Sequence, residues 1–105
     1  MNGYYVYILE CVDKTLYTGW TSNIAKRVRE HNGGKGGAKY TRARRPVRLV
    51  YTEACSCLSD VLKREAQIKR MSRFGKLELI AKVPYRQDHN FPENSLPKYP
   101  LKKHP

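Results

Sequence analysis

The N-terminal part of the chain has two short runs of apolar and aromatic residues separated by a polar turn. Residues 4–11 read YYVYILEC, with apolar side chains at both alternating sets of positions. This pattern predicts a β-strand that is buried on both faces. Residues 16–20 form a second run, and the polar residues 12–15 between them suit a hairpin turn.

The register of this predicted hairpin decides whether its tyrosines can act together. Side chains alternate between the two faces of a sheet, and directly paired residues share a face. Tyr7 and Tyr17 therefore share a face only if the hairpin pairs residues with an even sum of positions, such as Leu9 with Tyr17. A slip of one residue would put the two phenols on opposite faces.

Beyond the hairpin, the pattern predicts a helix, a loop and a third strand. Residues 23–32 have helical periodicity, with Ser22 as the expected N-cap and a Gly-Gly pair as the stop. The glycine-rich, basic residues 33–45 are expected to form a loop. Residues 47–52, which read VRLVYT and follow a proline, predict the third strand.

Two more helices are expected in the second half of the chain. Residues 58–71 have helical periodicity, with Ser56 or Ser59 as the expected N-cap. Gly75 is expected to break this helix, and residues 76–83 to form a shorter one.

The composition changes after this last helix. Residues 84–105 hold five of the six prolines and few branched apolar residues, so this basic tail is expected to be extended or disordered. Residues 1–83 are expected to form one folded domain, since a chain of 105 residues can bury a modest core.

The charge of the chain points to a polyanionic partner. Lys and Arg total 21 against nine Asp and Glu, which gives a formal net charge of +12. Nucleic acid is the simplest partner for such an excess, and a basic surface without a partner is the alternative. No apolar run approaches the roughly 20 residues that a membrane span needs.

The cysteines favour a reducing compartment over a disulfide framework or a metal site. The chain has three cysteines and no signal peptide, and a cytoplasmic location is expected. Cys55-Ser56-Cys57 lacks the four ligands of a structural zinc site. Cys11, Cys55 and Cys57 are therefore expected to be small residues, buried or half-buried.

A cation and an imidazole fall on or near the apolar stripe of the first helix. Ile24 and Val28 define the stripe, His31 follows at i+7 of Ile24, and Arg27 lies at its edge. Arg29, Lys26 and Glu30 point elsewhere on the helix. The alternative interpretation is a packed histidine beside an arginine that extends its head group to water.

A carboxylate interrupts the stripe of the second helix. Leu58, Val61, Leu62 and Ile68 define that stripe, and Glu65 lies among them. An ionised carboxylate is costly to bury without a partner, so Glu65 needs a cation, a metal or a water-filled cleft. The structural alternative is an ion pair with Lys69 at i+4 or with Arg27 across the interface.

Together these residues have the side chains that metal-assisted phosphodiester hydrolysis requires. Tyr7 and Tyr17 offer proton-transfer groups, Arg27 offers a phosphate clamp, His31 offers a second base and Glu65 offers a hard oxygen ligand. One carboxylate, waters and a substrate phosphate suffice to hold a single Mg²⁺. A tyrosine acting as base needs nearby positive charge to lower its pKa.

These residues, in this order, resemble the GIY-YIG endonuclease family. The two tyrosine boxes of that family correspond to residues 5–7 (YVY) and 17–19 (YTG). Arg27 and His31 match the family's arginine and the histidine or tyrosine four positions later. Glu65 matches its metal-binding glutamate on a later helix.

The resemblance spans roughly residues 3–83 and is closest to small single-domain bacterial members. Residues 37–41 (GAKYT) and 46–51 (PVRLVY) carry this closer likeness. It implies an α+β fold in which helices flank a three-stranded antiparallel sheet. It also implies one-metal hydrolysis of phosphodiester bonds.

The resemblance implies a role for each matched residue. One tyrosine activates water and Arg27 holds the scissile phosphate. Tyr17 is expected to be the base with Tyr7 assisting, and His31 is the alternative proton acceptor. Glu65 is expected to bind a single Mg²⁺ or Mn²⁺.

Two neighbouring positions are expected to shape the site, and two others depart from the family pattern. Gly19 is expected to leave room for close approach of backbone and substrate, and Thr21 to assist by hydrogen bonding. Many members carry Lys after the second box, where this chain has Trp20. Better-studied nucleases have an Asn some ten residues after the metal-binding Glu, whereas this chain has no Asn between Asn32 and Asn90.

A basic stretch is the expected contact for the phosphate backbone. Residues 26–48 hold nine Lys or Arg and one acid, and no P-loop Lys-Ser/Thr ending is present, so no small-molecule cofactor is expected. The expected nucleic-acid contacts are Lys35, Lys39, Tyr40, Arg42, Arg44 and Arg45, with the tyrosine available for stacking.

Two functions remain open at this level. One is a monomeric, metal-dependent DNA endonuclease, with repair or recombination as its setting. The other is a non-catalytic nucleic-acid-binding module that keeps the fold. Whether the target is structured DNA, damaged DNA or RNA is left open by the residues.

Overall fold

The computed structural model describes residues 3–33 and 36–82. The expected tail over residues 84–105 therefore lies outside the described residues, as does Lys35, one of the expected nucleic-acid contacts.

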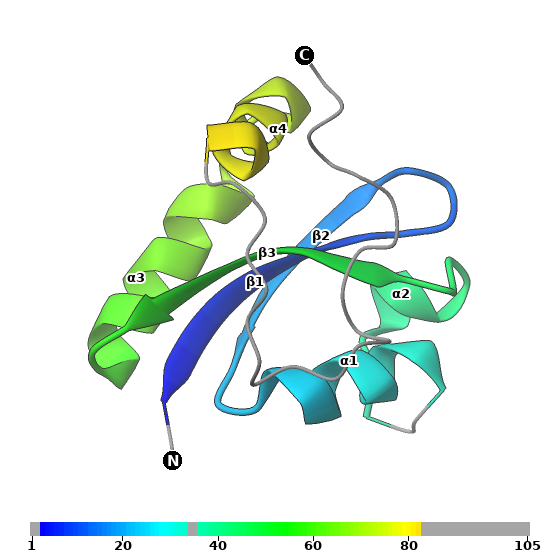
Figure 1. Ribbon diagram of the computed structural model, residues 1–105, viewed down its shortest axis with the longest axis horizontal. Coiled ribbons are helices and arrows are strands. Elements are labelled where there is room, and N and C mark those ends of the chain that lie inside the picture. The colour runs from blue at the N-terminus through cyan, green and yellow to red at the C-terminus, as the bar shows by residue number, and fades with distance from the viewer. Residues whose placement is uncertain (1–2, 34–35, 83–105) are drawn as a thin grey trace.

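The structure is built around one small antiparallel sheet. Its strands are β1 (Tyr4–Glu10), β2 (Leu16–Thr21) and β3 (Arg48–Cys55), in the order β2-β1-β3. Helices pack on both faces of the sheet (Figure 1), which confirms the expected α+β class. The central strand β1 is buried on both faces, as predicted from the apolar residues at both alternating sets of its positions.

The hairpin register confirms that Tyr7 and Tyr17 share a face. Leu9 pairs with Tyr17, and Tyr7 pairs with Gly19. The turn between the strands is closed by Asp13, whose carboxylate accepts hydrogen bonds from the Thr15 amide at 3.1 Å and the Thr15 hydroxyl at 2.6 Å. Such Asx turns are a reason why Asp is frequent in turns.

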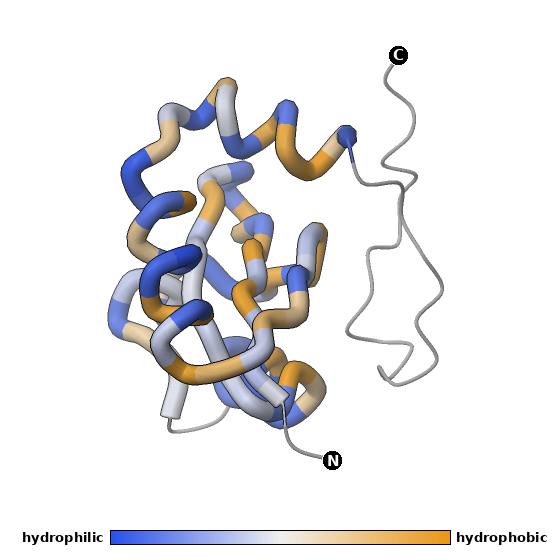
Figure 2. Tube along the Cα trace, turned by 90° about the vertical axis from the view of Figure 1, so that its left-hand side faces the viewer, coloured by the Kyte–Doolittle hydropathy of each residue, from blue (hydrophilic) through white to orange (hydrophobic). Residues whose placement is uncertain are grey.

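Two helices cover each face of the sheet. Helices α1 (Ile24–Asn32) and α2 (Lys39–Arg42) lie on the face that bears Tyr7, while α3 (Leu58–Lys69) and α4 (Arg73–Lys82) lie on the other (Figure 1). Figure 2 shows orange and blue segments alternating along the helical parts of the trace, as expected for helices with one apolar face.

Each pair of helices closes its own hydrophobic cluster. On one face Tyr7 and Leu9 pack with Ile24, Val28 and Leu49; on the other Val6 and Ile8 pack with Tyr51, Val61, Ile68 and Ile80. Burying one such aliphatic side chain contributes about 1.5–3 kcal/mol. The sheet is thus held from both sides.

An irregularity in β3 lets this strand serve both clusters. The register of β3 against β1 shifts between Ile8 and Leu9, so that Ile8 pairs with Tyr51 and Leu9 with Leu49. Val50 is the extra residue. Without it, Leu49 and Tyr51 would point to the same face.

The helix ends differ from several expectations. Asn23, not Ser22, is the N-cap of α1, and its side chain accepts a hydrogen bond from the Lys26 amide at 3.0 Å. The hydroxyl of Thr21 accepts from the Asn23 amide at 3.1 Å and so bends the chain into the helix. The cap falls on Asn23 because the helix begins at Ile24, whose side chain is the first to enter the core.

The expected caps and break in the second half of the chain were also wrong. Cys57 is the N-cap of α3, without a side-chain hydrogen bond, so neither Ser56 nor Ser59 has that role. Gly75 does not end a helix; its amide donates to the Ser72 hydroxyl at 3.0 Å, which makes Ser72 the cap of α4.

Exposure corrects two further expectations. Leu58 and Leu62, assigned to the apolar stripe of α3, are 44% and 43% exposed. Cys11 is buried and Cys55 half-buried as expected, but Cys57 is exposed; all three thiols are free. Among the described residues, no helix combines the length and apolar character needed to cross a bilayer.

A side-chain amide joins the end of α1 to the start of β3. The amide nitrogen of Asn32 donates to the Val47 carbonyl at 3.0 Å, and the Val47 amide donates to Asn32 Oδ1 at 2.7 Å. Asn32 thus satisfies both backbone groups of Val47, as a neighbouring strand would.

Candidate active site

The phenol of Tyr7 occupies the space that Gly19 leaves open on the neighbouring strand. A Cβ atom at Gly19 would lie 2.6 Å from Tyr7 Oη and 2.8 Å from Tyr7 Cζ. The sequence suggested that this glycine makes room for backbone and substrate. In the structure it makes room for the catalytic candidate Tyr7 itself, which is 1% exposed.

His31 is buried beside Tyr7 and hydrogen-bonded through both ring nitrogens. Its Nε2 lies 2.8 Å from Tyr7 Oη, and its Nδ1 lies 2.8 Å from Thr41 Oγ1. His31 is also packed in the α1 stripe with Ile24 and Val28, all three being buried. The structure therefore shows the packed histidine of the alternative interpretation, and its contact with Tyr7 leaves the role of His31 in the site as a prediction.

Arg27 faces the same phenol from the edge of α1. Its Nε donates to Tyr7 Oη at 3.4 Å, and its Nη1 donates to Glu30 Oε1 at 2.8 Å and to the Gly36 carbonyl. Glu30, expected to point elsewhere, is thus the ion-pair partner of Arg27. This pair holds the pKa of Glu30 below its ordinary value, through the hydrogen bond from Arg27.

Burial sets the protonation states of the two central groups. It raises the pKa of Tyr7 to about 12, although the hydrogen bond and the charge of Arg27 act in the opposite direction. Burial, with the charge of Arg27, lowers the pKa of His31 to about 4. At neutral pH the phenol therefore keeps its proton and the imidazole is neutral.

Tyr17 is the more accessible of the two phenols. It is half-buried, and its ring centroid lies 5.2 Å from that of His31 and 6.5 Å from that of Tyr7. Tyr40 stacks on it with centroids 5.8 Å apart, and Arg44 Cζ lies 4.0 Å from the Tyr40 ring centroid. Tyr40 is therefore already in contact with Tyr17 and Arg44, so a nucleobase could stack on its ring only beside these side chains or by displacing one of them.

The basic residues expected to contact nucleic acid fall into two groups. Arg44 donates to Asp13 and to the Tyr40 carbonyl, at 3.1 and 2.8 Å. Arg45 donates to the His31 carbonyl at 2.6 Å. Both guanidinium groups thus help to hold the segment that contains α2, whereas Lys39 and Arg42 are exposed.

Glu65 does not join the hydrogen-bonded group around Tyr7. It lies on α3, the helix on the opposite face, and its side chain is 17% exposed. Its Oε2 lies 3.2 Å from Lys69 Nζ, so the partner at i+4 is the one observed and Arg27 is not. Its charge still contributes to the raised pKa of Tyr7.

The donor set available for a metal is a single carboxylate. No group of three or more His, Cys, Asp or Glu side chains that could hold a metal occurs among residues 3–33 and 36–82. Glu65, half-buried and paired only with an exposed ammonium among the described residues, suits a hard cation that keeps its waters and binds substrate phosphate. The residues present therefore fit Mg²⁺ or Mn²⁺.

Thr41 is the site residue that sequence reasoning missed. It lies on α2, inside the stretch that was expected to be a loop, and is fully buried. Gly37 brings this segment against α1, because a Cβ there would lie 2.6 Å from the Glu30 carbonyl and 3.0 Å from His31 Cα. The GAKYT stretch was the available signal, but nothing in it singled out the hydroxyl.

Trp20 lies on the other face of the sheet. It pairs with Val6 and packs in the cluster under α3 and α4, with its ring centroid 6.2 Å from that of Tyr4. The position after the second box is therefore directed away from Tyr7 and Tyr17.

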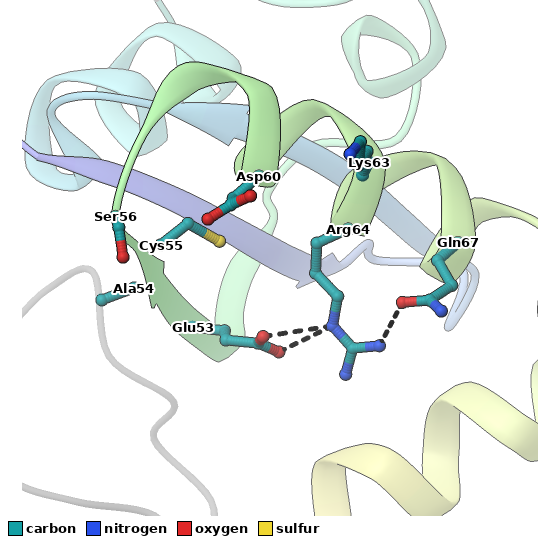
Figure 3. Close-up of a pocket in the computed structure, with 8 residues that line it drawn as sticks. All are labelled: Glu53, Ala54, Cys55, Ser56, Asp60, Lys63, Arg64 and Gln67. Carbon is teal, nitrogen blue, oxygen red and sulfur yellow. Dashed lines mark hydrogen bonds and ion pairs between the residues drawn. The ribbon is translucent and has the colours of Figure 1, made fainter.

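An open pocket on that other face contains none of the expected site residues. Glu53 of β3 is held by Arg64 Nε of α3 at 3.0 and 3.1 Å, and Arg64 Nη1 donates to Gln67 at 2.7 Å (Figure 3). Tyr51 donates to the same carboxylate at 2.6 Å, and its pKa is raised to about 12, by burial first and by Glu53 next. This network anchors α3 to the sheet.

Comparison with known proteins identifies the class to which this arrangement belongs. The family model described as the GIY-YIG catalytic domain matches residues 3–78. The chain belongs to the GIY-YIG family.

Its relatives within that family are UPF0213 proteins. A UPF0213 protein of Syntrophus aciditrophicus is 67% identical over 86 residues, which cover 82% of this chain and 99% of that protein. The solution NMR structure of a UPF0213 protein from Bacillus halodurans is 45% identical, with a TM-score of 0.51, covering 78% of this chain and 85% of that one. The solution NMR structure of a protein from E. faecalis is 34% identical in sequence to this chain, with a TM-score of 0.52. The match covers 85% of this chain and 96% of that one.

Proposed function

We propose that this protein is a metal-dependent endonuclease that hydrolyses phosphodiester bonds in DNA. The observation that carries the proposal is the grouping at Tyr7 Oη, which lies 2.8 Å from His31 Nε2 and 3.4 Å from Arg27 Nε, with the ring of Tyr17 beside it. The match to a catalytic domain over residues 3–78 and the net charge of +12 support the same activity.

Tyr17 is the proposed base. Its half-buried phenol can meet solvent, whereas Tyr7 is enclosed and its burial opposes ionisation. Tyr17 in its phenolate form would take a proton from the attacking water while the water oxygen bonds to phosphorus and the P–O bond of the leaving group breaks, and the leaving alkoxide would take a proton from solvent. Arg27, held by Glu30, would bind the scissile phosphate.

Glu65 would hold the metal ion. A divalent cation bound there would supply Lewis-acid stabilisation of the charge that develops on the phosphate oxygens. Helix α3 packs against β2, the edge strand that carries Tyr17, and the charge of Glu65 acts on Tyr7, so we propose that the substrate phosphate reaches both Arg27 and Glu65 at this edge. Lys69, the ion-pair partner of Glu65, is 51% exposed and free to swing into solvent, so the carboxylate can exchange this ammonium for a cation. DNA repair or recombination is the proposed setting, and a cytoplasmic location stays a prediction.

One observation favours a second candidate function, a non-catalytic nucleic-acid-binding module. The pKa of Tyr7 is raised to about 12 and that of His31 lowered to about 4. This pair therefore does not share its proton readily at neutral pH unless substrate or metal changes its surroundings.

A nicking assay separates the two functions. Branched, single-stranded and duplex DNA, and the corresponding RNA, are incubated with Mg²⁺ or Mn²⁺ and wild type, Glu65→Ala, Tyr17→Phe or Glu78→Ala. Glu78 is an exposed glutamate of α4, so Glu78→Ala is the matched control and should cleave like wild type. Cleavage that persists in Glu65→Ala would refute the metal-ligand role. Salt-sensitive binding without cleavage by wild type would favour the module.

A further inference from the structure

Thr41 has a buried hydroxyl between two polar atoms. Its Oγ1 lies 2.8 Å from His31 Nδ1 and 3.0 Å from the carbonyl oxygen of Ala38. Thr41 and His31 are both fully buried, so neither can exchange these contacts for water. The protons in this chain of contacts can therefore be assigned from the protein groups alone.

The assignment follows from the number of protons. A carbonyl oxygen only accepts, so the single hydroxyl proton of Thr41 goes to Ala38, and Thr41 then accepts from Nδ1–H. A neutral imidazole carries one N–H, and His31 is neutral at neutral pH. Nε2 is then left with its lone pair, and the Tyr7 hydroxyl donates to it over 2.8 Å.

The opposite tautomer satisfies the site less well. An Nε2–H would donate to Tyr7 Oη, which already faces the Arg27 donor, and among the described residues no other acceptor would remain for the Tyr7 proton. An unpaired buried hydroxyl costs about 1–3 kcal/mol.

Two contacts of Ala38 favour the opposite tautomer, in which Nδ1 carries no proton. The Ala38 amide points at Nδ1 but over 3.5 Å, and the Ala38 carbonyl also accepts from two backbone amides at 3.2 Å. The 2.8 Å contact itself is compatible with either direction, so the tautomer is decided by the Tyr7 proton, for which Nε2 is the acceptor among the described residues.

We propose that Thr41 is a positioning residue that holds His31 in its Nδ1–H tautomer, so that Nε2 accepts the hydroxyl proton of Tyr7. Its catalytic consequence rests on the proposed nuclease function. With this tautomer, the Tyr7 hydroxyl directs its proton at Nε2 and turns its lone pairs toward Arg27, which fixes the phenol beside Tyr17, the proposed base. With the other tautomer, no lone pair of the imidazole faces the phenol.

Nitrogen-15 NMR of the imidazole tests the tautomer directly. The protein carries His89→Gln and His104→Gln, so that His31 is its one histidine, and long-range ¹H–¹⁵N spectra are recorded near pH 7.5. We expect Nδ1 to resonate as a protonated nitrogen and Nε2 as an unprotonated one. A dominant Nε2–H tautomer would overturn the proposal, and this measurement needs no Thr41 variant to fold.

Two variants test whether Thr41 is the cause. Thr41→Val keeps the shape but removes the acceptor, and we expect the dominant tautomer to change to Nε2–H. Thr41→Ser restores the hydroxyl and should restore the wild-type signals. A folded Thr41→Val protein that keeps the Nδ1–H tautomer would overturn the role of Thr41.

Activity gives a separate readout. If wild type nicks DNA, Thr41→Val should lower kcat by about 10²-fold, as a small misplacement of a group in the site can. We expect little change in KM and rescue by Thr41→Ser. Unchanged kcat in Thr41→Val would overturn the catalytic consequence. If wild type does not nick DNA, the proposed function fails while the tautomer result still decides the assignment.

Discussion

Tyr7 and Gly19 face each other across β1 and β2, and the phenol of one fills the space left by the missing side chain of the other. The register puts them directly opposite, so any side chain at position 19 would meet the Tyr7 ring. The glycine of the second box is thus explained by the tyrosine of the first.

Gly19→Ala should therefore displace Tyr7. A Cβ atom 2.6 Å from Tyr7 Oη forces the ring away from His31, and overpacking of this kind costs about 1–3 kcal/mol. We expect a lower urea midpoint and loss of nicking. The matched control is Gly75→Ala, whose Cβ would have ordinary contacts with Ser72 Oγ at 3.4 Å and Met71 Cβ at 3.5 Å. It should equal or exceed wild-type stability, by up to about 1 kcal/mol. A Gly19→Ala protein as stable and active as wild type would contradict the close approach of Tyr7.

The stability of the fold should depend on pH through His31. Its pKa is lowered to about 4 in the folded protein and is near 6.5 in the unfolded chain, so only the unfolded chain binds a proton between these values. The free energy of unfolding is therefore unaffected by protonation of this histidine above pH 6.5 and falls by about 3 kcal/mol as the pH is lowered to 4.

Urea unfolding of wild type and His31→Gln at several pH values from about 7.5 to about 4 measures this dependence. The variant lacks the titrating group, so the difference in stability between the two proteins should shrink as the pH falls. A constant difference over this range would show that the pKa of His31 is not lowered by folding.

Lys69 should compete with a divalent cation for Glu65. Its ammonium lies 3.2 Å from the carboxylate, and an exposed ion pair of this kind contributes about 0–1 kcal/mol. Lys69→Gln should therefore tighten Mn²⁺ binding by at most about fivefold, measured by EPR titration of free Mn²⁺. Lys63→Gln, at the pocket of Figure 3, is the control and should leave the affinity unchanged. Weaker Mn²⁺ binding in Lys69→Gln would count against Glu65 as the ligand.

The basic residues of the α2 segment should separate into binding and structural groups. Lys39 and Arg42 are exposed, so Lys39→Gln with Arg42→Gln should lower the salt dependence of DNA binding. The log–log slope should fall by about 0.7–0.9 for each phosphate that the double variant no longer neutralises. Fluorescence anisotropy at several salt concentrations measures the slope.

Arg45→Met is the comparison for that pair. The Nε of Arg45 donates to the His31 carbonyl, so the substitution should lower stability by about 1–2 kcal/mol and leave the slope near that of wild type. If Arg45→Met changed the slope as much as the double variant, Arg45 would also bind phosphate.

The parts of the fold that follow simple periodicity were predictable. Apolar residues at both alternating sets of positions in residues 4–11 predicted a strand buried on both faces. The pairing of Leu9 with Tyr17 is the register that a shared face for both phenols requires. The 3.6-residue period placed His31 in the apolar stripe of α1, where it is buried.

The parts that depend on contacts between distant segments were not predictable. The carbonyl of Gly36, in the loop after α1, accepts a hydrogen bond from the Arg27 guanidinium. Thr41 gains its role only because Gly37 allows the loop to pack on α1. Glu65 interrupts an apolar stripe in the sequence, yet Leu62 near it is exposed, because α3 meets the sheet mainly through Val61 and Ile68.

The two hydrogen bonds between the Asn32 side chain and the Val47 backbone make the fold sensitive to deamidation of Asn32. Asn32 is followed by Gly33, and an Asn-Gly pair is the sequence most prone to deamidation. The resulting carboxylate can accept the Val47 amide proton but has none to donate to the Val47 carbonyl, which would then face a negative charge. A mass gain of one dalton in stored protein should therefore coincide with a lower melting temperature, and the damage would begin one residue away from His31.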